Sequence, residues 1–108
     1  MMVDVWKGMD IYSSEDLLNW TKQETRIVEH PGKGKDDQAM GGHGDVVVNN
    51  DKAYVFYFTH PGRLRGKVDA KNLFEMQRSV IQLAELHYAN GGITCDRDEP
   101  LDISLKEK

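Results

Sequence analysis

The strongest constraint on the fold is a pair of apolar runs separated by only two residues. The first run covers residues 45–49 and the second covers residues 52–59, and both are rich in β-branched and aromatic side chains. Asn50-Asp51 between them has the residue types of a tight β-hairpin turn. The second run carries apolar side chains on both faces, so it is predicted to lie between two layers.

Further β-strand signals flank this hairpin. Residues 8–13 are predicted to form a strand whose partner is residues 20–28, and residues 14–19 between them carry a Ser and acids typical of a helix first turn. Residues 80–88 fit a helix and a strand equally well by periodicity. However, Asn90-Gly91-Gly92 is typical of a hairpin turn that leads into another strand.

Composition excludes several classes of function. The chain has 108 residues, room for one small domain, and its 14 basic and 18 acidic residues give a net charge of −4. No overall positive field therefore favours nucleic acid or an anionic membrane surface. The longest strongly apolar run, residues 53–58, falls far short of the ~18 residues needed to span a bilayer, and the first residues show no signal-peptide pattern. The lone Cys95 cannot form an internal disulfide.

Two long connections point to the end of the sheet where a site is expected. Residues 29–42 and the basic residues 61–77 are predicted loops. If the strands are antiparallel neighbours, the short turns share one end of the sheet and the long loops share the other. Long loops on a rigid scaffold commonly carry function. The residues gathered at that end are His43, His60, Arg63 and Arg78.

Each of these side chains has a functional and a structural interpretation. His43 is flanked by glycines that allow a ligand or another backbone to approach closely, or it makes a structural polar contact at a strand entrance. His60 either binds a ligand or stabilises its loop. Arg78 offers a fork of donors suited to paired sugar hydroxyls or a carboxylate, or it forms a surface salt bridge.

Metal and phosphate motifs have weaker support. Zinc bound by His43, Asp45 and His60 is conceivable, but no recognised ligand spacing is present. Residues 32–36 lack the spacing of a phosphate-binding loop. Residues 96–99 carry enough acids for calcium but lack the EF-hand spacing, so a solvated turn is favoured there.

Three segments, in order, resemble glycoside hydrolase family 43. Residues 11–20 resemble the Ser-x-Asp-Leu-x-x-Trp segment near the outer strands of these five-bladed propeller glycosidases. Gly42-His43-Gly44 and the strand that follows resemble the family's Gly-His-Gly/Ala motif, and residues 78–82 resemble its late arginine segment. The resemblance covers roughly residues 8–98.

The resemblance implies an all-β fold in which blades of four antiparallel strands surround a central axis. Residues 80–88 are then a strand. Residues 3–28 hold the outer strands of one blade, residues 44–98 form one complete blade and residues 99–108 are a C-terminal tail. The chain is accordingly expected to be part of a five-bladed β-propeller, because a whole one needs about 250 residues or more.

The resemblance also implies a function. His43 matches the family's pocket histidine, near a central calcium in some members, and Arg78 matches an arginine that contacts substrate; His60 and Arg63 join them at the predicted pocket. The catalytic carboxylates belong to earlier blades, before Met1, so no catalytic residue is assigned here. We expect the C-terminal part of a glycosidase acting on arabinose-, xylose- or galactose-type glycosides, inactive alone and completed by the missing blades. The alternative is a noncatalytic carbohydrate-binding or assembly module that forms homo-oligomers.

Overall fold

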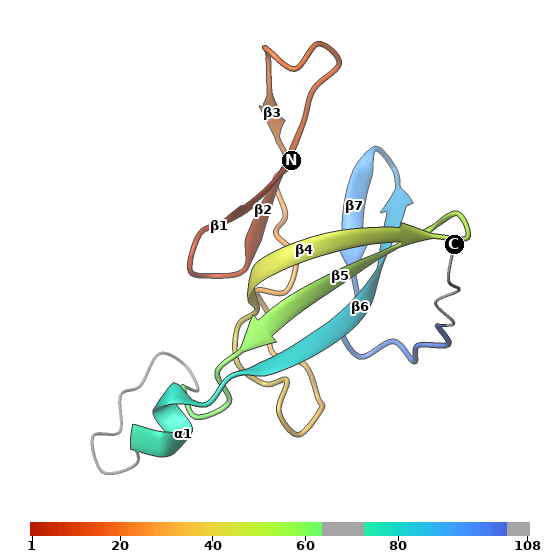
Figure 1. Ribbon diagram of the computed structural model, residues 1–108. Helices are drawn as coiled ribbons and strands as arrows, with labels where there is room; N and C mark the ends of the chain where they lie inside the picture. Colours follow the sequence, from red (N-terminus) through yellow and green to blue (C-terminus); the bar gives the residue numbers. More distant parts are fainter. Residues whose placement is uncertain (64–72, 104–108) are drawn as a thin grey trace.

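The computed structural model describes residues 1–63 and 73–103. Over these residues the chain is all-β with antiparallel sheets, as expected (Figure 1). The elements in chain order are β1 (Met2–Asp4), β2 (Met9–Ser13), β3 (Thr21–Lys22), β4 (Gly42–Asn49), β5 (Lys52–Thr59), α1 (Leu73–Gln77), β6 (Val80–Ala89) and β7 (Gly92–Cys95). Two predicted segments fall partly outside the described part. These are the basic loop, from which Arg65, Lys67 and Lys71 are left out, and the tail, of which residues 104–108 are left out.

The predicted hairpin is confirmed. β4 and β5 pair from Asp45↔Phe56 to Asn49↔Lys52. Asn50 and Asp51 join them with positive φ angles of 52° and 63°, as a type I′ turn requires, and such a turn matches the twist of the two strands.

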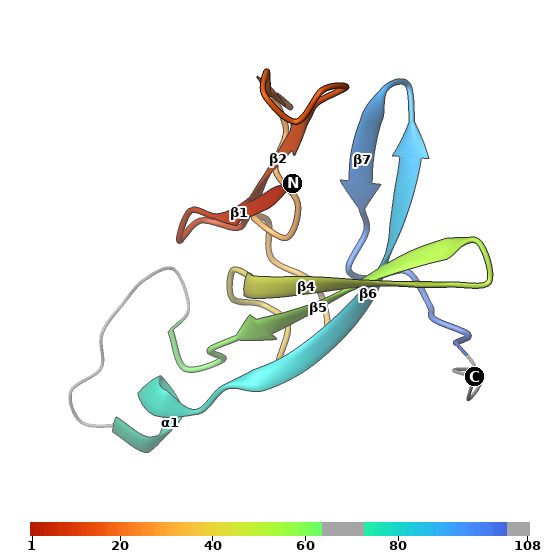
Figure 2. The ribbon, with the colours of Figure 1, turned by 45° about the horizontal axis from the view of Figure 1, so that its top comes forward.

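The ambiguous segment, residues 80–88, lies within strand β6. It pairs with β5 along its first part and with β7 from Leu86 onward, so a four-stranded sheet of order β4-β5-β6-β7 results. Its alternation places Ala84 in the core, with 2% of its surface exposed, opposite Val55. β6 is strongly bent, and the β6–β7 hairpin rises away from the β4–β5 hairpin (Figure 2).

The N-terminal sheet differs from the prediction. Residues 20–28 do not form one strand: only Thr21–Lys22 pair with β2, and one isolated bridge joins Met9 to Ile27. The chain leaves the strand path after Gln23, whose N–H still donates to the carbonyl of Ile11 and whose side-chain amide bonds to both backbone groups of Ile93 in β7, at 2.7 and 2.9 Å. β1 was not predicted as a strand, and it extends this sheet on the other side of β2.

The turn before β3 has capping chemistry without a helix. Ser14 Oγ accepts the N–H of Leu17 at 2.8 Å, and Asp16 Oδ1 accepts those of Leu18 and Asn19. Leu17 has a φ of 63°, a left-handed conformation that no right-handed helix contains. These hydrogen bonds lower the pKa of Asp16 and form a compact turn.

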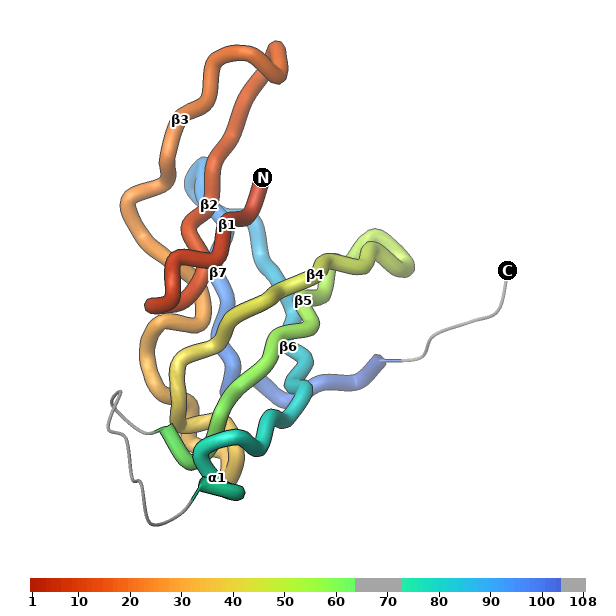
Figure 3. The backbone as a smooth tube through the Cα atoms, turned by 60° about the vertical axis from the view of Figure 1, so that its left-hand side comes forward, coloured from red at the N-terminus to blue at the C-terminus, as the bar shows by residue number. Residues whose placement is uncertain are grey.

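The hydrophobic core joins residues of the two sheets, whose backbone paths are drawn in Figure 3, with residues of the connection between them. Its buried members are Met9, Ile11, Ile27, Val28, Val55, Tyr57 and Ala84. The prediction that β5 is covered on both faces is wrong at Phe58, which is 38% exposed. Among the described residues, the core cluster lies on the face of β5 that carries Val55 and Tyr57, opposite the face of Phe58.

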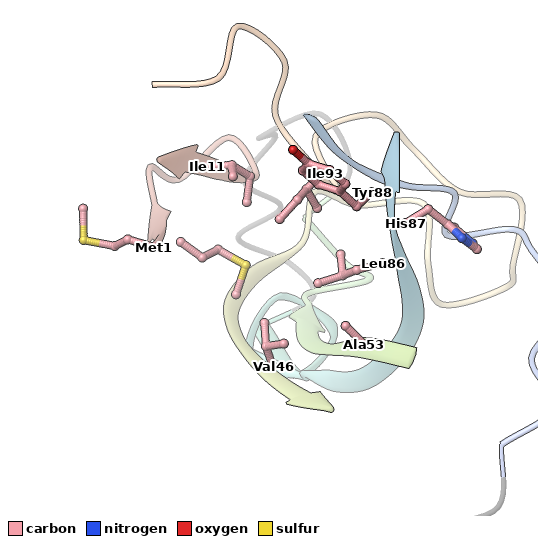
Figure 4. A pocket seen from close by; sticks show the side chains of 9 residues that line it. Met1, Ile11, Val46, Ala53, Leu86, His87, Tyr88 and Ile93 are labelled. Carbon is pink, nitrogen blue, oxygen red and sulfur yellow. The ribbon is translucent and has the colours of Figure 1, made fainter. Parts of the chain in front are cut away.

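An apolar groove of about 290 Å³ lies where the two sheets diverge (Figure 4). Met1, Met2 and Ile11 line it from the N-terminal side, and Val46 and Leu86 line it from the four-stranded sheet.

A buried polar cluster anchors the loop of residues 29–42 to the sheet. Asp37 accepts hydrogen bonds from Tyr57 Oη at 2.9 Å and from an Arg97 terminal nitrogen at 2.5 Å. The Arg97 guanidinium lies over the Tyr57 ring, 5.1 Å from its centroid, and also donates to the carbonyls of His30 and Ala39. We call Asp37, Tyr57 and Arg97 the buried arginine cluster.

Both long connections meet the four-stranded sheet at the same end of its strands, as predicted. Gly42 pairs with Phe58, and Thr59 pairs with Val80, so the starts of β4 and β6 lie beside the end of β5. The connection predicted as the loop 61–77 also holds α1, whose Met76 is buried. In the described part of the chain no helix has the length and apolar character needed to cross a membrane.

The propeller implied by the resemblance stays a prediction. Neither sheet closes into a ring over the described residues.

Candidate functional site

His43 lies in a β-bulge at the start of β4. Gly42 is opposite Phe58 and Asp45 is opposite Phe56, so the β4 side holds one residue more than the β5 side between these pairs. His43 itself has a φ of 51°. Bulges of this kind redirect a side chain out of the regular alternation, and the His43 side chain is 54% exposed.

The glycines around His43 let β1 pass close to β4. A Cβ on Gly42 would lie 2.9 Å from Asp4 Oδ2, and one on Gly44 would lie 2.9 Å from Met2 Cε. A larger residue at either position would require these β1 side chains to shift. The Gly-His-Gly sequence therefore has a steric reason in this fold, which is to bring Asp4 next to His43.

Asp4 joins the backbones of Trp6 and His43 through its two carboxylate oxygens. Oδ1 accepts the backbone N–H of Trp6 at 2.9 Å, and Oδ2 accepts the backbone N–H of His43 at 2.8 Å. The Trp6 and His43 rings meet edge to face, with centroids 5.6 Å apart and planes at 89°. The indole is well exposed, since 70% of the Trp6 surface is open to solvent.

These residues form a small cleft, which we call the His43 cleft. Its volume is about 30 Å³, and it is lined by Asp4, Trp6, Met40, Gly42, His43, Phe58 and His60. Phe58 stands 6.1 Å from the imidazole, centroid to centroid. The cleft thus combines exposed aromatic faces with two imidazoles and a carboxylate, but its volume is well below the about 300–1,000 Å³ of small-molecule pockets, so it can contact only part of a ligand.

The structure brings two of the four predicted residues into this cleft. His43 and His60 both line it, and His60 Nδ1 lies 3.3 Å from the carbonyl oxygen of Arg78. Arg63 and Arg78 do not line the cleft. Arg63 Nε donates to the carbonyl of Met76 at 2.6 Å.

The Arg78 guanidinium is held by two carboxylates. Its terminal nitrogen lies 3.1 Å from Asp36 and 3.0 Å from Glu75. The hydrogen bonds that Arg78 donates to Asp36 and Glu75 raise its pKa. The salt-bridge interpretation describes the arrangement seen, and contact between Arg78 and a substrate stays a prediction.

Metal ligands do not converge where the sequence placed them. Within residues 1–63 and 73–103, three ligating side chains come within 4.8 Å of one another only at Glu85, His87 and Glu99, so His43, Asp45 and His60 form no such group. The cleft does not fit calcium, which takes six to eight oxygen ligands, because Asp4 is the carboxylate lining it and both its oxygens already accept N–H groups.

The sequence reasoning missed Asp4 and Trp6. A usable signal was present, because an Asp followed two residues later by the N–H it accepts is an Asx turn. Asp4 and Trp6 have this spacing and this hydrogen bond. The long-range bond to His43, 39 residues away, has no local signature.

No protein-family model and no curated protein matches the chain. The likeness to family 43 glycosidases therefore depends on the three motifs alone.

Proposed function

We propose that the His43 cleft is one wall of a saccharide-binding site, which this chain contributes to a family 43-like glycosidase acting on arabinose-, xylose- or galactose-type glycosides. The observation that carries the proposal is the edge-to-face pair of exposed Trp6 and His43 rings, whose backbones both donate to the Asp4 carboxylate. A flat indole suits the C–H face of a sugar ring, and an imidazole suits a hydroxyl.

The same geometry supports binding without hydrolysis by this chain. Glycosidases need two carboxyl groups, about 5–5.5 Å or 6.5–9.5 Å apart, on either side of the bond that breaks. Among the described residues that line the cleft, the carboxylate is Asp4, and its oxygens hold backbone N–H groups. The acid and base are therefore proposed to come from other blades.

The test uses the intrinsic fluorescence of Trp6. The chain has two tryptophans, so Trp20→Phe leaves Trp6 as the reporter. We expect titration with xylo-, arabino- or galacto-oligosaccharides to change Trp6 emission, and we expect His43→Ala in the same background to weaken binding at least tenfold. His30→Ala, which removes an exposed imidazole outside the cleft, is the matched control and should bind like its parent.

Two results would contradict the proposal. One is a Trp6 emission that no saccharide changes, and the other is equal binding by the His43→Ala and His30→Ala proteins. Separately, turnover of an aryl glycoside that a single carboxylate substitution abolishes would show that the chain is itself a catalyst.

An assembly module is the second candidate, and the edge of β4 favours it. β4 ends the order of the four-stranded sheet, and Val46, Val47 and Val48 on it are 41%, 38% and 72% exposed. An apolar edge strand pairs readily with another strand, and a lysine on such an edge opposes pairing. Sedimentation should then show oligomers that Val47→Lys dissociates; a wild-type chain that stays monomeric at high concentration would exclude this function.

A further inference from the structure

We propose that Glu85, His87 and Glu99 form a surface binding site for a zinc ion. This site lies outside the His43 cleft, and it does not depend on the function proposed for that cleft.

Two of the ligands follow from the strand geometry of β6. Residues two apart on a strand lie on the same face, so Glu85 and His87 are neighbours on the face opposite Ala84 and the core. His87 is one of the residues that line the inter-sheet groove, and its ring points away from the apolar side chains there (Figure 4). Both side chains come from a rigid paired strand, because Glu85 is opposite Tyr54 and His87 is opposite Thr94. His87 is exposed and Glu85 is half-buried.

The third ligand comes from a turn that other groups hold in place. After β7 the Glu99 N–H donates to the carbonyl of Asp96 at 3.1 Å, and the Asp98 N–H donates to Asp96 Oδ1 at 3.0 Å. Asp98 Oδ1 in turn accepts the N–H of Lys33 at 2.6 Å. These bonds fix the turn and leave the Glu99 carboxylate directed at His87.

The distances suit a single small cation. The three ligating atoms lie within 4.8 Å of one another, and His87 Nε2 is 2.7 Å from Glu99 Oε2. Zinc binds nitrogen and oxygen at about 2.0–2.2 Å in tetrahedral geometry, so two of its ligands stand roughly 3.3–3.5 Å apart. Opening the His87–Glu99 pair by less than about 1 Å admits the ion, and these side chains are 45% and 34% exposed, which leaves them room to move.

The chemistry of the three ligands favours zinc over calcium and magnesium. Two carboxylates and a neutral imidazole carry a charge of −2, which balances a divalent cation. Zinc accepts mixed imidazole and carboxylate ligands, whereas calcium and magnesium prefer oxygen alone. Three protein ligands leave a fourth position for water.

Protons compete with the metal for His87. The hydrogen bond and charge of Glu99 and the charge of Glu85 raise the pKa of His87 above its ordinary value of 6.5, while Lys52 on β5 acts in the opposite direction. Zinc binds the neutral imidazole, so the titration below is made at pH 8.

The test is calorimetric titration of the full chain with zinc chloride at pH 8. We expect one ion per chain, at least tenfold weaker binding by His87→Ala and by Glu99→Gln, and unchanged binding by His30→Ala. The imidazole NMR signals of His87 should shift on zinc addition, and the wild-type Tm should rise with zinc while that of His87→Ala does not.

Several results would overturn the proposal. These are no saturable zinc binding by the wild-type chain, equal affinities of wild type, His87→Ala and Glu99→Gln, or a site that prefers calcium to zinc. Because the variants change exposed side chains, circular dichroism should show that each of them folds.

Discussion

The buried arginine cluster and the His43 cleft both combine an aromatic ring, a cation or imidazole and a carboxylate, but they treat these groups oppositely. In the buried cluster the Arg97 and Asp37 side chains are 5% and 7% exposed and bond to each other. In the cleft the His43 side chain is 54% exposed and its Nδ1 stands 3.7 Å from Asp4. In the buried cluster the cation and the carboxylate bond to each other, whereas in the cleft the carboxylate bonds backbone N–H groups and the imidazole stays open to solvent.

The difference indicates which polar groups serve the fold and which are available to a ligand. A buried charge is costly unless it is paired and hydrogen-bonded, so Arg97 and Asp37 depend on each other. An exposed imidazole keeps its hydration and loses little if no partner arrives. We therefore expect substitutions in the first cluster to change stability, and those in the second to change binding.

The largest effect is expected from Arg97→Met. The change leaves the Asp37 carboxylate buried without its cation, which in other buried pairs costs about 3–5 kcal/mol. Urea unfolding followed by circular dichroism measures the loss. Lys7→Met, on an exposed residue, is the matched control and should stay within about 0.5 kcal/mol of wild type; equal stabilities of the two variants would show that the cluster does not hold the fold.

A smaller loss of folding stability is expected from Tyr57→Phe. The ring stays packed against the Arg97 guanidinium, but Asp37 loses the phenol hydrogen bonds of 2.9 Å. Removing one partner of a buried hydrogen bond costs about 1–3 kcal/mol. The same unfolding experiment should place the stability of this variant between those of wild type and Arg97→Met. A loss larger than that of Arg97→Met would mean that the Tyr57 hydroxyl, and not Arg97, contributes most to the stability of the cluster.

The sequence predicted local features of the fold better than long-range ones. Asn50-Asp51 determines a turn by its own backbone preferences, so the hairpin was predictable. Residues 80–88 have no local preference, and they become a strand because β5 and β7 flank them with open hydrogen-bonding edges. Residues 20–28 have local strand signals but pair with β2 only at Thr21 and Lys22, and Gln23 bonds to a residue 70 positions away.

The candidate site shows the same limit. Connections between antiparallel neighbours alternate between the two ends of a sheet. This rule placed His43 and His60 at one end from the sequence alone. It did not distinguish side chains that line the cleft from those that turn aside, so Arg63 and Arg78 were grouped with them. Their actual partners, Met76, Asp36 and Glu75, depend on how α1 and the loop of residues 29–42 pack.

The third prediction concerns the stability of the cleft itself. His43→Ala removes an exposed ring whose contacts are with Trp6 and Phe58, so the free energy of unfolding should change by about 0.5 kcal/mol or less. Saccharide affinity is expected to fall at the same time, as argued for the Trp6 titration. A loss of stability comparable to that of Arg97→Met would place His43 with the structural cluster and remove the contrast between the two.

The last and smallest effect tests an intermediate case, since His87 is exposed and yet paired with Glu99. The hydrogen bond to Glu99 raises the folded-state pKa of His87 above 6.5, so the protonated imidazole is favoured in the folded chain. Its contribution to stability is therefore complete below about pH 6.5 and is lost as the pH rises through the folded-state pKa. In metal-free buffer His87→Gln should lower the Tm slightly at pH 5.5 and leave it unchanged near pH 9, whereas His30→Gln should show neither effect. An equal loss at both pH values would mean that His87 acts through packing, and exposure alone would then not separate structural polar groups from those available to ligands.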